Sequence, residues 1–233
     1  MTMTRLDQFI ALSTPLSRKE ARRAIHASRV QVDGEVCKAT NTKVSETASV
    51  TLDGQPCTIP GAQYLMLYKP AGVVSATRDS EHPTALDLLP PELLRDLHIA
   101  GRLDIDTTGL LLLTTDGQWS HRITSPRVEC QKTYRVTLSE PIEQPAISAL
   151  ESGVELRNEP KPIRPAGVTV LEPKVIELTI SEGRYHQVKR MLAAVGNHVE
   201  ALHRIRIGEI ALDPALGPGE FRPLTQAEID SVG

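Results

Sequence analysis

The first 58 residues carry a helical pattern of hydrophobic positions with a clear start. Ser17 followed three residues later by Glu20 is a capping box, in which each side chain satisfies a backbone N–H at a helix start. A helix is therefore predicted over about residues 18–28. Its apolar residues fall on one stripe at helical spacing: Ala21, Ala24 and Ile25.

Two further short elements flank this helix. Leu6, Phe9 and Ile10 predict a short helix before it. The stretch "RVQVDGEV" alternates apolar and polar residues around Asp33-Gly34, which favours a two-residue hairpin turn because glycine tolerates positive φ. The N-terminal region is thus predicted to hold two short helices and a hairpin.

A turn-rich stretch separates this region from the rest of the chain. Residues 54–63, "GQPCTIPGAQ", contain two glycines and two prolines, a composition typical of a linker. We therefore predict two domains, residues 1–58 and residues 59–233.

The second domain mixes strand-like and helical segments. "YLMLYKPAGVVSAT" predicts two strands joined by a turn at Pro70 and Gly72, and "HPTALDLLPPELLRDL" is helical but interrupted by Pro90-Pro91. Further strands are predicted in "KTYRVTL", "VIELTISEG" and "ALHRIRIGEIAL", and a helix ending at Gly196 in "RYHQVKRMLAAVG". Without a regular βαβ rhythm or a Gly-rich phosphate loop, the pattern favours an α+β domain with a mostly antiparallel mixed sheet flanked by helices.

Composition is that of an ordinary globular chain of 233 residues, 40% apolar. No apolar run approaches the roughly 18 to 20 residues of a membrane span, and the N-terminus lacks the layout of a secretory signal. Cys37, Cys57 and Cys130 lie far apart, without the spacing of zinc sites or disulfide frameworks. We expect a cytoplasmic monomer with no metal and no membrane contact.

The distribution of charge points to a polyanion partner although the net charge is −3. Residues 1–58 carry eight Lys/Arg and six Asp/Glu, a net of +2, so the remainder sums to −5. Four basic residues project from the polar side of the capped helix: Arg18, Lys19, Arg22 and Arg23. They suit contact with an RNA backbone, although a solvated helix face has the same pattern. The region resembles the alpha-L (S-four-type) RNA-binding motif, which implies an RNA partner.

The stretch "GRLDIDTTGLLLLTTDG" places polar residues directly before an apolar run, residues 110–113. A carboxylate at the edge of buried structure can act as base or nucleophile if a cation keeps it ionised, and Asp104 is the candidate. Asp106, with Thr107 and Thr108, is predicted to shape the loop. A metal-binding pair of Asp104 and Asp106 in a phosphoryl- or glycosyl-transferring enzyme is the alternative.

Two other segments carry candidate side chains. Tyr134, in a strand of a chain with few aromatic residues, is a candidate base-stacking platform, although strand tyrosines more often pack in a core. In "SEGRYHQVKRML", Arg184 is a candidate substrate-binding residue, and the Lys189 ammonium can reach a buried carboxylate. A solvated amphipathic helix is the alternative for this segment.

Together, "YKPAGVV", "GRLDIDTTGLLLLTTDG", "KTYRV" and "SEGRYHQVKRML", in that order behind the alpha-L motif, resemble the RsuA family of pseudouridine synthases. The resemblance covers nearly the whole chain. It implies that the protein isomerises one uridine of 16S ribosomal RNA, at the position usually numbered 516, to pseudouridine. The expected partner is 16S ribosomal RNA or the assembling small ribosomal subunit.

The resemblance also implies roles for individual residues. Asp104 matches the essential aspartate, Tyr134 the tyrosine that stacks on the target base, and Lys189 the basic partner of the aspartate. Ile180 matches an apolar residue of the base pocket, and Arg102 is expected to fill the space left by the flipped base or to bind a phosphate. Many related synthases have arginine in place of Lys189.

The implied reaction explains why these residue types suffice. The bond from ribose to uracil nitrogen breaks and a bond to a ring carbon forms, without redox change, so no cofactor is expected. The nucleotide must leave the helix stack, and an aromatic face can recover part of the few kcal/mol that unstacking costs. A non-catalytic RNA-binding or ribosome-assembly factor remains the main alternative from the residues alone.

Overall fold

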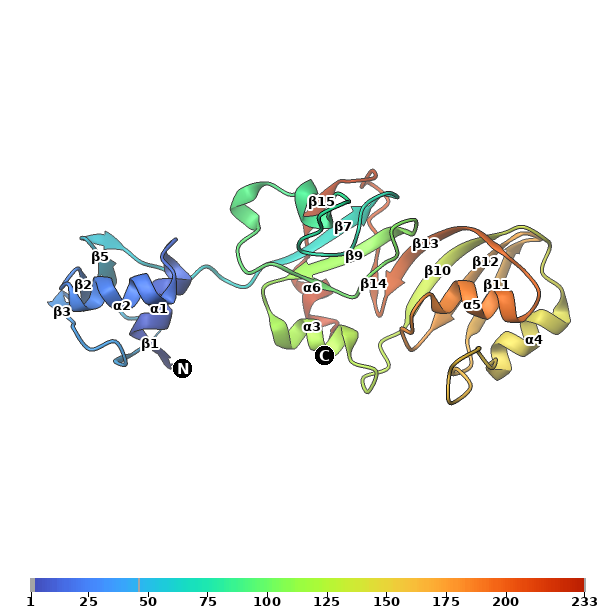
Figure 1. Cartoon of the computed structure of the whole chain (residues 1–233), viewed down its shortest axis with the longest axis horizontal. Helices are drawn as coiled ribbons and strands as arrows, with labels where there is room; N and C mark the ends of the chain where they lie inside the picture. Colours follow the sequence, from blue (N-terminus) through green and yellow to red (C-terminus); the bar gives the residue numbers. More distant parts are fainter. Residues whose placement is uncertain (1–2, 46, 233) are drawn as a thin grey trace. The chain divides into compact units, whose positions relative to one another are not determined.

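The computed structural model describes residues 3–45 and 47–232 (Figure 1). The chain forms two compact units, residues 1–61 and 62–233, whereas the predicted boundary lies after residue 58.

The N-terminal unit contains the two predicted helices, α1 (Leu6–Ser13) and α2 (Arg18–His26). Both hydrogen bonds of the capping box between Ser17 and Glu20 are present. Helix α2 ends two residues before the predicted position, because Ser28 takes a left-handed backbone conformation with φ 61°. The predicted turn at Asp33-Gly34 joins β2 (Val30–Val32) and β3 (Glu35–Val36).

Two small sheets complete this unit. β2 and β3 belong to a four-stranded sheet of order β3-β2-β5-β6, and a second sheet pairs β1 with β4. The remaining strands are β1 (Met3–Arg5), β4 (Lys43–Ser45), β5 (Val50–Leu52) and β6 (Gln55–Pro56). Apolar residues from both helices and from the strands form one core, which includes all three residues of the predicted α2 stripe. The unit therefore has its own hydrophobic interior.

The second unit is built on one large mixed sheet of order β11-β12-β10-β13-β9-β7-β15. Its strands are β7 (Tyr64–Lys69), β9 (Thr108–Thr114), β10 (Lys132–Leu138), β11 (Gly167–Glu172), β12 (Val175–Ile180), β13 (Val199–Ile207) and β15 (Phe221–Pro223). β8 (His98–Ala100) pairs with β9, and β14 (Ile210–Ala211) pairs with β13. Only β9 and β13 run parallel among the described strand pairs, so the predicted mostly antiparallel mixed sheet is confirmed.

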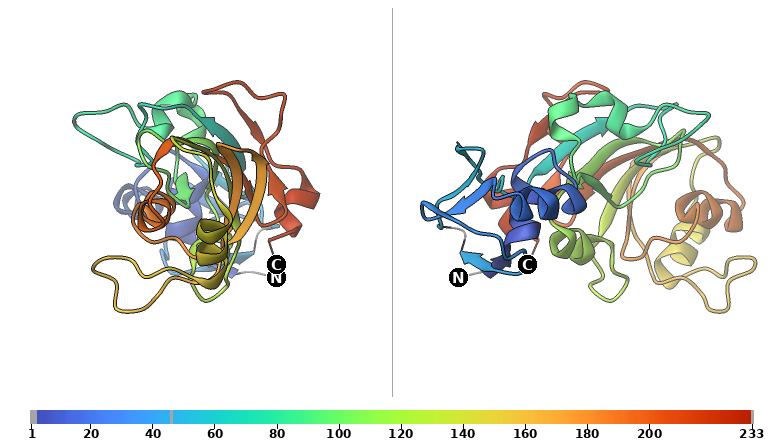
Figure 2. Two further views of the ribbon diagram at one scale, coloured as in Figure 1. Left: turned by 90° about the vertical axis from the view of Figure 1, so that its right-hand side faces the viewer. Right: turned by 60° about the vertical axis from the view of Figure 1, so that its left-hand side comes forward.

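The apolar run of residues 110–113 is the middle of β9, and both faces of that strand are buried. Leu111 and Leu113 belong to one core cluster, while Leu110 and Leu112 belong to another. Successive side chains of a strand point to opposite faces, so the clusters lie on the two sides of the sheet. Helices α4 (Gln144–Ser152) and α5 (Gln187–Ala194) contribute to the first cluster, and α3 (Gly117–Thr124) and α6 (Gln226–Asp230) to the second (Figures 1 and 2).

Two expectations for this unit are wrong. The segment after the Pro70-Gly72 turn forms no second strand, since Val74 makes only a single bridge, to Thr84. The segment predicted as an interrupted helix contains two 3₁₀ turns, η1 (Ala85–Leu88) and η2 (Pro91–Leu93). Pro90 and Pro91 supply no backbone N–H, so a longer helix cannot continue through them.

The remaining general expectations concern cysteines and membranes. Cys37, Cys57 and Cys130 are free thiols. No helix among the described residues combines the length and apolar character needed to cross a bilayer.

Candidate active site

The candidate carboxylate Asp104 lies in the loop between β8 and β9, residues 101–107. Leu103, its neighbour, is buried, and the Leu103 N–H donates a 3.0 Å hydrogen bond to Ser75 Oγ. The Thr107 N–H donates to the Asp104 carbonyl at 3.1 Å, closing a turn around the intervening residues. The loop is therefore fixed at both sides of the carboxylate, whose side chain is 27% exposed.

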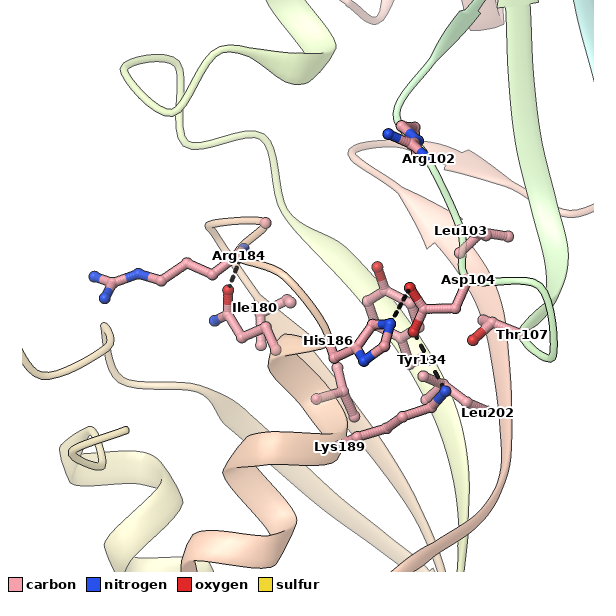
Figure 3. Close-up of a pocket in the computed structure, with 13 residues that line it drawn as sticks. Arg102, Leu103, Asp104, Thr107, Tyr134, Ile180, Arg184, His186, Lys189 and Leu202 are labelled. Atoms are coloured by element: carbon pink, nitrogen blue, oxygen red, sulfur yellow. Dashed lines mark hydrogen bonds and ion pairs between the residues drawn. The ribbon is translucent and has the colours of Figure 1, made fainter. Parts of the chain in front are cut away.

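Lys189, from α5, contacts both carboxylates of this loop (Figure 3). Its ammonium donates to the two oxygens of Asp106 at 2.7 and 2.8 Å and lies 3.3 Å from Asp104 Oδ2. Asp106 is predicted from sequence to shape the loop, yet its side chain, 65% exposed, is the closer partner of Lys189. The predicted Asp104–Lys189 pair is present, and a second carboxylate shares the same cation.

The contacts among Asp104, Asp106 and Lys189 favour the charged form of Asp106 and of Lys189. The hydrogen bond from Lys189 lowers the pKa of Asp106 below its ordinary value. Burial by itself would lower the pKa of Lys189, but the hydrogen bond to Asp106 and the charges of both carboxylates raise it above its ordinary value. Lys189 therefore stays charged, and a fixed positive charge lies beside Asp104.

His186 is a third group against the Asp104 carboxylate, and sequence reasoning gave it no role. Its Nε2 lies 3.4 Å from Asp104 Oδ1. His186 has φ 48°, a left-handed conformation, and α5 begins only at Gln187 instead of at the predicted start of the segment. Such backbone is uncommon outside glycine and is concentrated at functional sites. The neighbouring Tyr185 ring stacks on His186 with centroids 3.8 Å apart and is 77% exposed.

The pocket beside Asp104 brings together every candidate of the second domain. Tyr134, 9% exposed, and Ile180, 3% exposed, line it from β10 and from the end of β12, and Leu202 lines it from β13. Asp104 and Lys189 lie at the same pocket (Figure 3). An aromatic ring, two aliphatic side chains and a charged rim are suited to a flat, partly polar ring such as a nucleobase.

The two arginine candidates of the pocket differ in their contacts. Arg102 lines the pocket but is exposed, and Figure 3 shows its side chain apart from the Asp104 carboxylate. Arg184 donates to Glu159 Oε2 at 2.9 Å and to Glu182 Oε2 at 3.2 Å. The Arg184 guanidinium therefore ties neighbouring loops together in the structure described here, and its backbone borders the pocket.

Two buried cations that sequence reasoning missed support the Asp104 loop. Lys69, at the end of β7, is fully buried and donates to the carbonyls of Pro70 at 2.8 Å and Ile105 at 3.3 Å. Burial lowers the pKa of Lys69 to about 8, although the charges of Asp106 and Asp104 oppose this. A lysine at a strand end before Pro-Ala-Gly gave no signal of burial.

Arg204, on β13, is the second of these cations and is 2% exposed. It donates to the carbonyls of Leu110 at 2.8 Å, Gly101 at 3.0 Å and Arg102 at 3.3 Å. It also lies beneath Tyr134, with its Nη1 3.5 Å from the phenol oxygen. A signal was available, because Arg204 alternates in phase with the buried Leu202.

A glycine allows β13 to approach the loop. Gly109 has φ 104°, and a Cβ there would lie 2.3 Å from the Arg204 carbonyl oxygen. The parallel pairing of β9 with β13, at His203–Thr108 and Arg204–Gly109, needs this close approach.

The predicted RNA-binding residues lie on α2 in the N-terminal unit, where all four are exposed. Two of them form ion pairs with the buried carboxylate of Asp7, which also pairs with Arg5. Asp7 Oδ2 lies 2.8 Å from Arg22 Nε and 3.3 Å from Arg18 Nε. Burial by itself would raise the pKa of Asp7, but hydrogen bonds from the three arginines lower it well below its usual range. Asp7 therefore orders part of the basic face formed by Arg18, Lys19, Arg22 and Arg23.

Family models match both units of the chain. An S4 domain model matches residues 4–50, and an RNA pseudouridylate synthase model matches residues 63–194, more than half of the chain. The chain belongs to the RNA pseudouridylate synthase family. It is therefore an isomerase with an RNA substrate, and the alternative of a non-catalytic RNA-binding factor falls away.

Relatives and a solved structure agree with this membership over nearly the full length. Ribosomal small subunit pseudouridine synthase A of Escherichia coli (strain K12) is 54% identical over 229 residues, 98% of this chain and 99% of the relative. The protein of the same name from Yersinia pestis is 53% identical over 230 residues, 98% of each chain. A crystal structure of a pseudouridylate synthase is similar with a TM-score of 0.72 and 48% identity, covering 98% of this chain and 99% of that one.

Proposed function

We propose that this pseudouridine synthase converts one uridine of 16S ribosomal RNA, at the position usually numbered 516, into pseudouridine. The names of the relatives, which match this chain over 98% of its length, support a small-subunit RNA substrate. The numbered position comes from the resemblance of the motifs. The substrate is 16S RNA itself or the assembling small subunit.

One observation carries the assignment of the reactive group. Asp104 lies at the mouth of the pocket, contacts Lys189 and His186, and is part of a loop anchored by buried side chains. A partly buried carboxylate beside a cation, on a loop that is held in place, is suited to nucleophilic or general-base chemistry. Asp106 is more exposed and accepts two short hydrogen bonds from Lys189, so its oxygens are less available.

The reaction can be followed through these residues. The glycosidic bond from ribose C1′ to uracil N1 breaks, the base turns, and a bond from C1′ to C5 forms. The proton on C5 is lost and N1 gains a proton. Asp104 acts on the nucleotide as nucleophile or as proton-abstracting base, while the walls formed by Tyr134, Ile180 and Leu202 retain the detached uracil.

Lys189 keeps a positive charge at the rim of the pocket. Its compact ammonium contacts both oxygens of Asp106 and one oxygen of Asp104. An arginine would instead favour a planar, two-point contact with one of the two carboxylates. The basic face of α2 supplies contacts to RNA phosphates.

The assignment of Asp104 is tested by Asp104→Asn, which keeps the shape of the side chain and removes its charge. We expect this variant to form no pseudouridine in 16S RNA, as read by carbodiimide labelling and primer extension, while its affinity for the RNA persists. Asp106→Asn is the matched control and should retain activity, because Lys189 still contacts Asp104. Full activity of Asp104→Asn would contradict the role given to this residue.

The target is tested separately. Pseudouridines mapped in 16S RNA from cells that lack the protein should show the loss of one site, and the gene for the intact chain should restore it. An unchanged map would show that the substrate is another RNA.

A further inference from the structure

Thr107 has a buried hydroxyl for which the described residues offer no hydrogen-bond partner. The side chain is 1% exposed, and its Oγ1 is one of three buried side-chain atoms among the described residues in this condition. The other two, on Thr51 and Gln63, do not line the pocket. Leaving a buried polar group unpaired costs about 1 to 3 kcal/mol, so such a group needs an explanation.

The position of Thr107 supplies that explanation. Thr107 lines the pocket together with Asp104 and Tyr134, and Figure 3 shows its hydroxyl oxygen on the side that faces these residues. It ends the turn whose first residue is Asp104, through the hydrogen bond from its own N–H to the Asp104 carbonyl. The hydroxyl and the carboxylate are thus fixed in one turn beside one pocket.

Two threonines of the following strand, β9, have hydroxyls that are hydrogen-bonded within the protein. Thr108 Oγ1 is 2.8 Å from His203 Nδ1. Thr114 Oγ1 donates to the Gln63 carbonyl at 2.7 Å and accepts from the Asp116 N–H at 2.9 Å. Both are satisfied within the protein, whereas Thr107, in the same segment, is not.

We propose that the Thr107 hydroxyl forms a hydrogen bond with the target nucleotide, at its ribose or its uracil, when that nucleotide occupies the Asp104 pocket. This inference rests on the proposed role of the pocket as the uridine site. A hydroxyl both donates and accepts, so it can pair with the ribose 2′-hydroxyl or with an oxygen or N–H of uracil.

Access to this hydroxyl requires the side chains at the pocket rim to part when the nucleotide enters. The side chains of Asp104 and Lys189 are each 27% exposed, and that of His186 is 37% exposed. Asp104 Oδ2 lies 3.3 Å from Lys189 Nζ, and Asp104 Oδ1 lies 3.4 Å from His186 Nε2. These contacts are at the long end of the range for ion pairs and hydrogen bonds, and catalytic contacts often rearrange when substrate binds. Thr107 gains its partner in that rearranged state.

Two substitutions separate a ligand-binding role from a structural one. Thr107→Val keeps the shape and removes the hydroxyl, so the free protein loses nothing and its Tm should stay equal or rise. Its kcat/KM, measured by tritium release from RNA carrying 5-³H-uridine, should fall by about tenfold or more. Thr107→Ser keeps the hydroxyl and removes a buried methyl, so it should lose Tm but keep kcat/KM within about threefold of the wild-type protein.

Thr114→Val is the matched control, since it removes a buried hydroxyl that is satisfied in the free protein. It should lower Tm by roughly 2 to 8 °C and leave kcat unchanged when measured well below its Tm. Asp104→Asn in the same assay tests the pocket itself.

The outcomes are distinct. Unchanged kcat/KM in Thr107→Val, with Asp104→Asn inactive, overturns this inference and leaves the proposed function intact. A Thr107→Val protein that fails to fold, or loses Tm as Thr114→Val does, also overturns it, because the hydroxyl would then be structural. Full activity of Asp104→Asn instead overturns the proposed function on which the inference rests.

The two parts of the nucleotide are distinguished with RNA that carries 2′-deoxyuridine at the target position. The ratio of the Kd values of Thr107→Val and the wild-type protein falls to one on this RNA if the partner is the ribose hydroxyl. The ratio is unchanged if the partner is on uracil. Equal Kd and equal kcat/KM of the two proteins on ordinary RNA contradict both assignments.

Discussion

Lys69 and Lys189 lie near the same two aspartates, but their surroundings shift their pKa values in opposite directions. Lys189 lies at the pocket rim, bound to two carboxylates that raise its pKa. Lys69 lies inside the fold, where burial lowers its pKa to about 8 and its hydrogen bonds go to backbone carbonyls. Lys189 places positive charge beside Asp104, and Lys69 holds the loop that carries Asp104.

The depressed pKa of Lys69 makes stability depend on pH. Its pKa rises from about 8 in the folded chain to the ordinary 10.5 on unfolding, so the unfolded chain binds more protons between these values. The contribution of Lys69 to the free energy of unfolding therefore increases as pH rises through this window. From pH 7.5 to 9.5 the increase should be about 1 to 2 kcal/mol.

The measurement is urea unfolding of the wild-type protein and of Lys69→Met at both pH values. Groups other than Lys69 titrate in both proteins and cancel in the comparison. The free-energy difference between the two proteins should change in favour of the wild type at the higher pH. An identical pH dependence of the two proteins would show that Lys69 is charged and compensated in the folded state.

The sequence motifs singled out residues that line one pocket, but they did not predict the buried groups that support its loop. Asp104, Tyr134 and Lys189 were singled out by motif, and the structure brings them to one pocket. Lys69 was missed because its partners are the backbone carbonyls of Pro70 and Ile105, and a carbonyl leaves no trace in a sequence pattern. Arg204 was missed although it alternates in phase with the buried Leu202. Asp106 was assigned to the shape of the loop, and its contact with Lys189 was not foreseen because that contact depends on where α5 lies.

At the scale of elements, the site depends on the junction where β13 meets the start of β9. Gly109 permits this junction by its positive φ and its missing side chain. Gly109→Ala places a methyl group against the Arg204 backbone and should cost about 3 kcal/mol or more, which corresponds to a fall in Tm of roughly 10 °C. Thermal unfolding followed by circular dichroism measures this fall.

Gly117→Ala is the control for a glycine of ordinary conformation. A Cβ at Gly117 meets no atom within 4 Å, and the residue begins α3, so alanine should be neutral or raise Tm slightly. Similar effects of the two substitutions would contradict the role of close approach at Gly109.

Element prediction succeeded where a local signal and tertiary packing agree. The capping box predicted the start of α2, and alternation predicted β10 and β12. The segment after β7 failed because Val73 and Val74 have a strand-like composition but no neighbouring strand to complete a ladder. The predicted start of α5 was wrong because His186 takes a left-handed conformation, so the helix begins only at Gln187.

At the scale of the whole molecule, the candidate RNA-binding face and the candidate active site lie in two different compact units. Lys19 and Arg23 are exposed on α2, whereas Arg18 and Arg22 also neutralise the buried Asp7. Removing the latter pair would leave the buried Asp7 with Arg5 alone of its three arginine partners and would destabilise the unit, so it is a poor test of RNA binding.

A double substitution of Lys19 and Arg23 to glutamine tests the RNA-binding face. The slope of log K against log salt concentration for 16S RNA should become shallower by about 1.5, because two phosphate contacts are lost. Turnover at saturating RNA should be unchanged, since both residues belong to the unit that does not contain the pocket. An unchanged slope would mean that these two residues are solvated without touching phosphate.

The strand that carries the loop has a consequence for how the protein loses activity. β9 is paired along one edge with β7 and along the other with β13 and β8, and its four leucines are fully buried. Backbone amides in such a strand exchange with deuterium mainly through global unfolding. Because the loop that carries Asp104 leads directly into this strand, we expect heat inactivation to coincide with unfolding of the sheet.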